Sequence, residues 1–386
     1  MVAAHDDELS RLVEQLNRKT VAAKSSDSTS LDQLLAMAVQ RNASDILLVA
    51  GSSVTLRVKG ALAQASGAPM SPEDIRGLLL PLLTTTQAEE LAKNKSLDFC
   101  FLHGSIGRFR ANFHYQRGTL AASIRVLPTQ IPTLESLHLP PSLAHLAERR
   151  QGLVLLTGPT GCGKTSTLAA LIDLINSRRR DHIITIEDPI EYQHANRSSI
   201  VEQIQVGQDT PSFAHAVRAV LRQDPDVILV GEMRDRETMA AALTAAETGH
   251  LVLSSLHTND ASQTMSRILD LLPTGHGSQQ PSQMRQQLSL ALVAVISQQL
   301  VAAADSANRY PALEIMMATS AVRNLIRSGQ DHQIRSHIST GRAEGMMTME
   351  QSLAELVRSG RIQRETAIDH CYHVAELNQY LSDSPR

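Results

Sequence analysis

The sequence is poor in the residues on which several classes of protein depend. It has no tryptophan, and aromatic residues make up 3% of its 386 positions, too few for the stacking platforms of single-strand nucleic-acid binders. Its three cysteines stand alone rather than in C-x-x-C pairs, which excludes a disulfide framework and a four-cysteine zinc ribbon. A net charge of −3 provides no global basic field. We therefore expect no nucleic acid among its partners.

Long hydrophobic runs are also lacking. The longest covers residues 290–296, far short of the ~20 residues that cross a bilayer. The start of the chain has neither the basic n-region nor the apolar h-region of a signal peptide. At 42% hydrophobic residues the chain has ample material for packed cores, and its length predicts two or three domains. We expect a cytoplasmic protein.

The changing texture of the chain predicts four segments. Residues 1–30 are expected to be an N-terminal extension, with an amphipathic helix near residues 9–16 and a polar linker. Residues 31–128 contain short alternating runs, typical of an antiparallel sheet with helices on one face, an α+β domain. In residues 129–345 a proline-rich connector leads into alternating strands and helices, typical of a mostly parallel α/β core. Residues 346–386 are predicted to form helices.

Individual elements can be placed within these segments. Ser30 is expected to cap a helix that begins at Leu31. In the α+β domain we expect strands at 45–49, 54–58, 98–102, 108–113 and 121–126. Beyond Pro311 the chain is expected to be largely helical, with helices at 318–327, 348–358 and 364–380.

Residues 158–165 form a G-x-x-x-x-G-K-[ST] phosphate-binding loop in a fitting context. An apolar strand at 153–156 precedes it, and an apolar helical stripe follows it. Such a turn aims backbone N–H groups and a helix dipole at one point, where a phosphate binds. Lys164 would carry charge to the outer phosphates, and Thr165 would offer its hydroxyl to Mg²⁺. The nucleotide-binding residues predicted here are Gly158, Pro159, Thr160, Gly161, Cys162, Gly163, Lys164, Thr165 and Ser166.

Two acidic segments follow short apolar strands. Residues 227–230 end in Gly231-Glu232, and an acid at the carboxyl end of such a strand lies beside the phosphate loop. Glu232 can therefore hold the attacking water in line or accept its proton; alternatively it only orders Mg²⁺ through water. The strand at 184–186 ends in Glu187, a candidate second carboxylate on the Mg²⁺–water network. An ordinary solvated strand end is the alternative for Glu187.

Two histidines flank one apolar strand. His250 precedes residues 251–253 and His257 follows the strand, seven positions later. At ~3.3 Å per residue the two rings would lie near opposite ends of the strand, which argues against joint metal ligation. His257 follows the carboxyl end, on the nucleotide side, and could sense or polarise the γ-phosphate. His250 is the weaker candidate, because a satisfied core histidine explains it as well.

The α+β domain carries several arginines. Arg110 and Arg125 belong to neighbouring predicted strands and could project from one face, and Arg117 lies between them in sequence. On the sequence alone, solvated edge arginines are the favoured explanation of this pattern. These residues alone do not establish a catalytic arginine.

Four sequence boxes stand in the order in which they occur in the type II/type IV secretion ATPase superfamily. They are GPTGCGKTST, TIEDPIEYQH, LRQDPDVILVGEMRD and AAETGHLVLSSLHTNDA. The segment AVRNLIR at 321–327 resembles the C-terminal signature of PilT-like ATPases, which retract type IV pili in twitching motility. The likeness covers residues 31–377.

This resemblance implies a hexameric ring of two-domain subunits, with a PAS-like N-terminal domain and a RecA-like ATPase domain that uses ATP and Mg²⁺. It implies that ATP lies between the two domains and that arginines of the N-terminal domain complete the site. Residue by residue, it implies Glu232 as the hydrolytic base, Glu187 as the acidic-box carboxylate, His250 and His257 as functional histidines, and Arg110, Arg125 and Arg117 as the arginines. The ring is expected to dock on an inner-membrane platform protein at the pilus base, at the inner face of the membrane, and paralogous pilus ATPases are further candidate partners.

Two positions depart from the family pattern. Cys162 stands in the phosphate loop where serine is usual; its backbone N–H is unaffected, so a simple replacement that keeps binding is the favoured interpretation. The alternative is a redox-sensitive thiol, because a helix N-terminus lowers a thiol pKa. Ser328 stands where the retraction signature usually ends in glutamate.

Three other functions compete with a retraction motor. Pilus-assembly and type II secretion ATPases generally have a longer N-terminal domain and a four-cysteine zinc insertion, which this chain lacks. An accessory retraction paralogue that depends on a partner ATPase is harder to exclude. A non-hydrolysing nucleotide-gated scaffold would not need a water-activating acid, so the joint presence of Lys164, Thr165, Glu187 and Glu232 argues against it.

Overall fold

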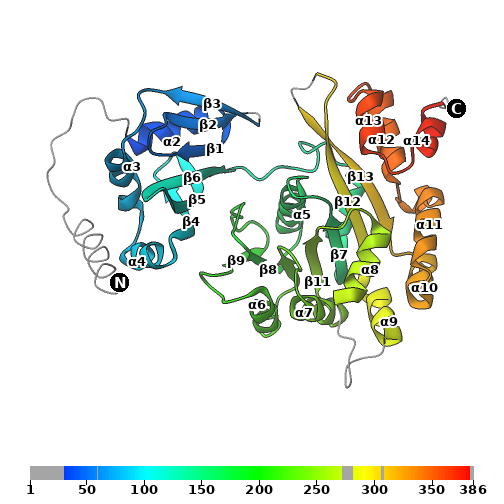
Figure 1. Cartoon of the computed structure of the whole chain (residues 1–386). Coiled ribbons are helices and arrows are strands. Elements are labelled where there is room, and N and C mark those ends of the chain that lie inside the picture. Colours follow the sequence, from blue (N-terminus) through cyan, green and yellow to red (C-terminus); the bar gives the residue numbers. More distant parts are fainter. Residues whose placement is uncertain (1–29, 59, 272–280, 306–307, 383–386) are drawn as a thin grey trace. The chain divides into compact units, whose positions relative to one another are not determined.

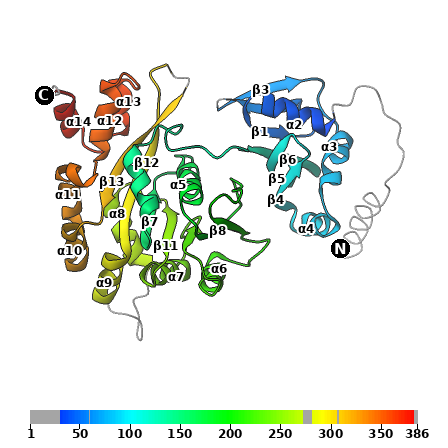
Figure 2. The ribbon, with the colours of Figure 1, turned by 180° about the vertical axis from the view of Figure 1, so that it is seen from behind.

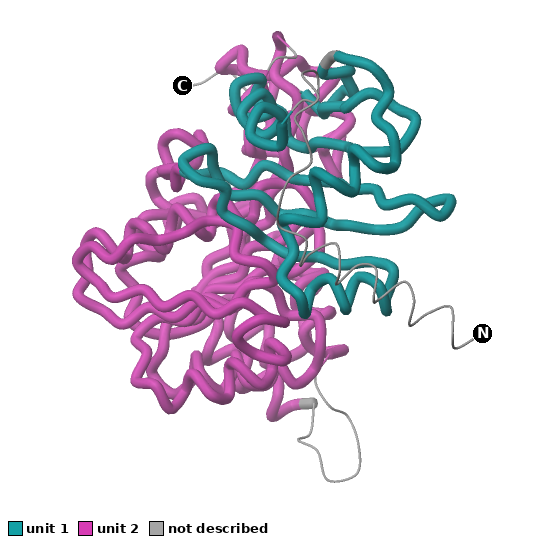
Figure 3. The backbone as a smooth tube through the Cα atoms, turned by 90° about the vertical axis from the view of Figure 1, so that its left-hand side faces the viewer, with its two compact units in different colours: residues 1–129 teal, residues 130–386 magenta. Residues whose placement is uncertain are grey.

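The computed structural model describes residues 30–58, 60–271, 281–305 and 308–382. The chain divides into two compact units, residues 1–129 and residues 130–386 (Figure 3). The amphipathic helix predicted near residues 9–16 lies outside the described residues. The two units are described one at a time.

Unit 1 is built on a six-stranded antiparallel sheet in the order β3-β2-β1-β6-β5-β4 (Figure 1). Its strands are β1 (Ala43–Leu48), β2 (Val54–Val58), β3 (Ala61–Ser66), β4 (Ser96–His103), β5 (Gly107–Gln116) and β6 (Thr119–Leu127). Its helices are α2 (Leu31–Gln40), α3 (Pro72–Leu79), the short 3-10 turn η1 (Leu80–Leu82) and α4 (Thr85–Asn94). The predicted antiparallel α+β domain is confirmed, and only β3 was not anticipated among its strands.

One face of this sheet forms the core of unit 1. Along β5 buried and half-buried residues alternate, so that Phe109 and Phe113 point to the buried face, while Arg108 and Arg110 lie on the other face. The helices cover the buried face with residues such as Leu35, and α2 begins as expected, because the Ser30 hydroxyl accepts the N–H of Gln33 in a capping box. The opposite face of the sheet is left polar.

Unit 2 contains a seven-stranded sheet in the order β13-β12-β7-β11-β10-β8-β9. Its strands are β7 (Gly152–Thr157), β8 (His182–Glu187), β9 (Ile200–Gln205), β10 (Val227–Val230), β11 (Leu251–Leu256), β12 (Leu292–Ala302) and β13 (Arg309–Met317). Only the pair β12–β13 is antiparallel. The predicted mostly parallel α/β core is confirmed.

Helices pack on both faces of this sheet, as in other α/β folds. Residues of β7 alternate between two apolar cores, with Leu153 and Leu155 in one and Val154 and Leu156 in the other. The 3-10 segment η2 (Pro141–Glu148) and α5 (Lys164–Arg178) cover one face. The other face packs against α6 (Phe213–Val220), α7 (Arg236–Glu247), α8 (Ala261–Leu271) and α9 (Pro281–Ala291) (Figure 2). β10 and β11 are buried along their whole length, as central parallel strands require.

The C-terminal part of unit 2 corrects two predictions. Residues 309–317 form the strand β13 rather than part of a helical region, because they pair with β12 over nine positions and are almost entirely buried. The single helix predicted at 364–380 is divided into two, because the Glu350 carboxylate accepts the backbone N–H groups of Tyr372 and His373, both at 3.0 Å. The helices here are α10 (Ser320–Ser328), α11 (Ile334–Thr340), α12 (Met349–Arg358), α13 (Arg364–His370) and α14 (Val374–Ser382), with 3-10 turns η3 (Asp331–Gln333) and η4 (Arg342–Glu344).

Candidate functional site

The predicted phosphate loop joins the carboxyl end of β7 to the first turn of α5. Gly158 and Gly163 have φ angles of 136° and 91°, a region that side chains with a Cβ rarely adopt. A Cβ at Gly158 would lie 2.2 Å from the backbone carbonyl oxygen of Gln298. A Cβ at Gly163 would lie 2.9 Å from the side-chain nitrogen Nε2 of the same residue. Glycine is therefore required at both positions for the loop to pack against β12.

Lys164 lies in the hollow of this loop with 8% of its surface exposed. Its Nζ donates to the carbonyl oxygens of Gly158 at 2.7 Å and Pro159 at 3.0 Å. Burial lowers the pKa of Lys164, whereas the nearby Cys162 and Glu232 act in the opposite direction. The strand, loop and helix thus hold a cation where the N-terminus of α5 collects its orphan N–H groups.

Cys162 differs from the expectation for a thiol near a helix N-terminus. Its side chain is 3% exposed, and its Sγ lies 3.9 Å from the Nζ of Lys164. Burial raises the pKa of the Cys162 thiol despite the lowering effect of the Lys164 charge. The shift is opposite to the one that a helix N-terminus alone would cause, so the thiol stays protonated and packed, in keeping with a simple replacement of serine.

The rim of the loop is open. Pro159, Thr160, Gly161 and Thr165 are exposed, so a ligand can reach the loop from this side. Behind the rim, the hydroxyl of Ser166 is hydrogen-bonded to that of Tyr192 at 2.8 Å. The loop thus combines an accessible edge with a braced interior.

Glu232 follows β10, at the carboxyl end of the sheet where β7 delivers the phosphate loop. Its side chain is 16% exposed and pairs with the Nε of Arg234 at 2.6 Å and the Nε2 of His257 at 3.4 Å. His257 directly follows β11, the strand between β10 and β7, and half of its side chain is exposed. The structure therefore brings Glu232, His257 and Lys164 to one edge of the sheet.

Glu187 ends β8, next to β10, and the N–H of Gly231 after β10 donates to the carbonyl oxygen of Ile186 at 2.8 Å. Its carboxylate is buried and accepts hydrogen bonds from the Thr185 hydroxyl at 2.7 Å and the Gln203 amide at 3.0 Å. Burial raises the pKa of Glu187, against the lowering effect of these two donors. Glu187 is thus a buried, hydrogen-bonded carboxyl group rather than a solvated strand end, and it lies at the carboxyl edge of the sheet, where the phosphate loop also lies.

His250 is placed elsewhere. It precedes β11, and its carbonyl accepts the N–H of Gly152, where β7 begins. Its ring nitrogen Nδ1 lies 2.9 Å from the carbonyl oxygen of Ala245. The six residues of β11 span about 20 Å, so His250 lies at the opposite edge of the sheet from the phosphate loop. Its predicted role at the nucleotide finds no support in the geometry of this subunit.

The arginines of unit 1 form part of a row across its polar sheet face. Arg110 pairs with Arg125, Arg125 with Asp45, and Asp45 with Arg57 in successive strand registers. The Nε of Arg125 donates to Asp45 at 2.9 Å, which fixes one of the cations. The predicted common face of Arg110 and Arg125 is confirmed. Arg117 lies exposed in the turn after β5, at the far end of the strand from Arg110, and is not brought beside them.

Gln298 is a residue of this site that sequence reasoning missed. It lies on β12 with 3% of its surface exposed. Its Nε2 donates to the carbonyl oxygen of Cys162 at 2.6 Å, and its Oε1 accepts the Thr167 hydroxyl at 2.9 Å. The signal available in the sequence was the pair Gln298-Gln299 within the otherwise mostly apolar run 290–303, where a buried amide needs partners.

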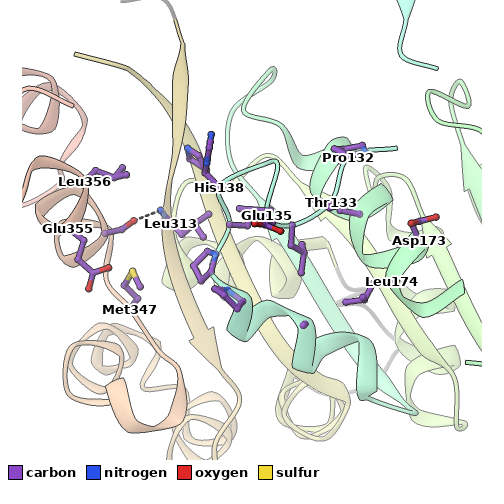
Figure 4. Close-up of a pocket in the computed structure, with 18 of the residues that line it drawn as sticks. Pro132, Thr133, Glu135, His138, Asp173, Leu174, Leu313, Met347, Glu355 and Leu356 are labelled. Atoms are coloured by element: carbon purple, nitrogen blue, oxygen red, sulfur yellow. Dashed lines mark hydrogen bonds between the residues drawn. The ribbon is translucent and has the colours of Figure 1, made fainter. Parts of the chain in front are cut away.

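A cavity of about 1210 Å³ lies in unit 2, away from the phosphate loop (Figure 4). It is lined by Asp173 and Leu174 of α5, by Glu135 and His138 of the connector, and by residues of β13 and α12. None of the predicted nucleotide or catalytic residues lines it. The cavity therefore does not coincide with the phosphate loop, whose rim is open.

A parallel sheet, a phosphate loop at a helix N-terminus and an acid at the end of a neighbouring strand together define a P-loop nucleoside triphosphatase. The family model described as "Type II/IV secretion system protein" matches residues 24–378. The chain belongs to this family.

Several of its relatives carry names that refer to pili or to twitching motility. A "Twitching motility protein" of Neisseria gonorrhoeae is 45% identical over 313 residues, which cover 81% of this chain and 82% of that protein. The "Type IV pilus ATPase PilU" of Pseudomonas aeruginosa is 40% identical and covers 90% of both chains. The crystal structure of the pilus retraction motor PilT with bound ADP is 42% identical, with a TM-score of 0.84 over 91% of this chain and 99% of that chain.

Proposed function

We propose that this protein is an ATPase whose hydrolysis of ATP powers type IV pilus retraction. The observation that carries the proposal is the convergence of Lys164, Glu232 and His257 at one edge of the unit 2 sheet. The likeness to a retraction motor solved with ADP supports the choice of substrate and task. The loop N–H groups and Lys164 hold the phosphates, which would replace the carbonyl acceptors that Lys164 now contacts.

The residues around the loop fit Mg²⁺. Thr165 is exposed on the rim, and Glu232 supplies carboxylate oxygens, the hard ligands that Mg²⁺ prefers. Among the described residues, no group of three or more His, Cys, Asp or Glu side chains is arranged so that it could hold a metal ion by itself. Bound Mg²⁺ would neutralise charge on the phosphates. Glu187 is our candidate for ordering its water shell.

Glu232 is the group that aligns the attacking water. Arg234 contacts one of its two oxygens and His257 contacts the other, so the carboxylate is oriented and can accept a proton from water. His257 follows β11, which lies between the strand that leads to Glu232 and the strand that leads to the phosphate loop. From this position its ring can polarise the γ-phosphate. Arg110 and Arg125, on the polar face of unit 1, would supply cations that compensate the charge of the transferring phosphoryl group.

The finer assembly is part of the same proposal. We infer a homo-hexameric ring that docks on an inner-membrane platform protein at the cytoplasmic face, since the twitching and retraction relatives match most of this chain. No helix among the described residues is long and apolar enough to cross a membrane.

A second candidate is a role as an accessory pilus ATPase. It is favoured by one observation: two different pilus ATPases of Pseudomonas aeruginosa, PilU and PilT, are equally similar to this chain, at 40% identity each. An accessory subunit would need its partner ATPase for retraction, whereas a main motor would not.

Replacement of the chromosomal copy by Lys164→Ala tests the proposal in the cell. Loss of the loop cation is expected to abolish twitching while pili accumulate on the surface, which electron microscopy and colony spreading measure. Arg267→Ala, an arginine on the surface of α8, is the matched control and is expected to twitch normally. Normal twitching of the Lys164→Ala strain would contradict the main-motor role.

A further inference from the structure

Tyr372 lies in the break between α13 and α14, yet its side chain reaches the strands that carry the phosphate site. Its hydroxyl accepts a hydrogen bond from the Nε2 of Gln299 at 2.9 Å. The same hydroxyl donates to the carbonyl oxygen of Asn259 at 2.9 Å. Burial raises the pKa of Tyr372 to about 12, so the hydroxyl remains a donor throughout the physiological pH range. One side chain therefore bridges the strand β12 and the link that follows β11.

The first segment belongs to the strand that braces the phosphate loop. Gln298 and Gln299 are consecutive on β12, and their side chains point to opposite faces. Gln298 bonds the phosphate loop, whereas Gln299 bonds Tyr372 and lies 3.0 Å from the Nδ1 of His370. β12 is thus fixed between the loop on one side and the C-terminal helices on the other.

The second segment carries His257. Asn259 stands two residues after His257, in the link between β11 and α8. The link is also held where α8 begins, because the N–H of Ala261 donates to the buried Glu314 carboxyl at 2.8 Å. The contact with Tyr372 therefore fixes the middle of the link, close to the residue that pairs with Glu232.

Tyr372 itself is rigidly mounted. Its backbone N–H donates to Glu350, which is 0% exposed, at 3.0 Å. Glu350 in turn pairs with Arg335 at 2.9 Å. Because this buried carboxylate holds the backbone, the phenol ring projects from a fixed point rather than from a mobile connection.

We propose that Tyr372 is a positioning residue for ATP hydrolysis, because its hydroxyl holds the link that places His257 against Glu232. This inference rests on the proposed function of the site. A purely structural role would only attach the C-terminal helices to the sheet, and it would not depend on His257.

Tyr372→Phe removes the two hydrogen bonds and keeps the ring. One hydrogen bond is worth about 0.5–1.5 kcal/mol, so kcat for ATP is expected to fall about 2- to 13-fold with little change in KM. Tyr380→Phe is the matched control. Its hydroxyl also makes two hydrogen bonds, to Gln351 and Glu376 in the same helical region, and its kcat is expected to remain that of the wild type.

A double-mutant cycle separates positioning from attachment. In a His257→Ala background Tyr372→Phe is expected to cause no further loss of kcat. The inference is overturned if Tyr372→Phe has wild-type kcat, if it lowers kcat by the same factor in both backgrounds, or if His257→Ala itself has wild-type kcat.

Hydrogen exchange of the full-length chain gives a readout that needs no activity. Tyr372→Phe is expected to accelerate amide exchange in residues 257–261, whereas Tyr380→Phe is expected to leave it unchanged. A wild-type chain without ATPase activity would contradict the proposed function, but hydrogen exchange would still test whether Tyr372 holds the link. Unchanged exchange in the Tyr372→Phe chain would overturn the inference by itself.

Discussion

At the scale of single residues, the phosphate site depends on buried polar groups that form hydrogen bonds with one another. Gln298 connects the phosphate loop with the first turn of α5 by buried hydrogen bonds to Cys162 and Thr167. Each buried group left without its partner costs about 1–3 kcal/mol. The loop is therefore as dependent on a glutamine from β12 as on its own glycines.

Gln298→Ala tests this dependence. We expect ATP affinity to fall about 10-fold or more, because the loop loses its brace before it meets the phosphates. Titration with a fluorescent ATP analogue measures the change. Gln287→Ala on α9, which removes an exposed hydrogen bond to Glu247 of α7, is the control and is expected to bind normally. Equal affinity in the two variants would contradict the brace.

Glu314 makes the stability of unit 2 depend on pH. Burial raises its pKa from the ordinary value of 4.5 to about 7, and its neighbours Asp260 and Glu350 act in the same direction. Between these values the folded chain keeps a proton that the unfolded chain has lost. This contribution to stability is therefore complete below about pH 4.5 and is lost as pH rises through 7, an upper limit of about 3 kcal/mol.

Glu314→Gln is expected to flatten this dependence. The amide cannot ionise, but its oxygen can still accept the N–H of Ala261. Urea unfolding between pH 5 and 8 should show the variant to be more stable than the wild type at pH 8. Glu237→Gln, an exposed carboxylate on α7, should keep the wild-type slope. A Glu314→Gln curve parallel to the wild type would show that another group titrates.

At the scale of elements, paired helices explain the C-terminal signature. Arg323 of α10 donates to the carbonyl oxygens of Ser289 and Leu290 at the end of α9. In return Arg285 of α9 donates to the carbonyl oxygen of Ile326 at the end of α10 and pairs with Asp331. The exposed carbonyls at both helix ends are thereby satisfied, which fixes α9 and α10 together. Ser328 bonds within its own helix, to the carbonyl oxygen of Asn324.

Glu350 fixes the second C-terminal pair of helices. It is fully buried and accepts from the backbone of Tyr372 and His373 as well as from Arg335. We expect Glu350→Ala to lower the free energy of unfolding by about 3 kcal/mol, because buried donors and part of a buried charge lose their partner. Glu355→Ala on the same helix breaks only a surface pair with Arg342 and should cost less than about 1 kcal/mol. Denaturant unfolding compares the two, and equal losses would contradict the account.

Sequence patterns predicted the elements whose signals are local. The Ser30 cap, the alternation along β5 and the apolar stripe of α5 each depend on neighbours within a few positions. β13 was missed because its alanine, leucine, glutamate and methionine favour helix, and only pairing with β12 makes it a strand. The break near Tyr372 was missed because a carboxylate 22 positions away causes it.

The site shows the same division. Lys164, Glu232 and His257 follow from strand ends and a known loop pattern, so the sequence placed them at one edge. Gln298 comes from a strand far along the chain, and no local pattern connects it with the loop. The raised pKa of Cys162 likewise depends on burial, which the helix N-terminus alone does not reveal.

At the scale of the whole molecule, we propose that cations of unit 1 take part in the hydrolysis of nucleotide bound by unit 2. Arg110 and Arg125 share one sheet face, and Asp45 holds Arg125 in place. We therefore expect an Arg110→Ala/Arg125→Ala double variant to bind ATP but to hydrolyse it at least 10-fold more slowly. Arg76→Ala, on α3 of the same unit, is the control and should retain full turnover. A double variant with wild-type turnover would exclude these arginines from the site.

The most direct test of the central claim is the Mg²⁺-dependent ATPase rate per chain, measured as the concentration of the purified full-length protein is raised. For an ATPase that works as a ring, we predict a rate per chain that rises cooperatively with concentration and disappears in Glu232→Gln. A rate that stays at zero at every concentration, or a Glu232→Gln variant that turns over like the wild type, would contradict the account.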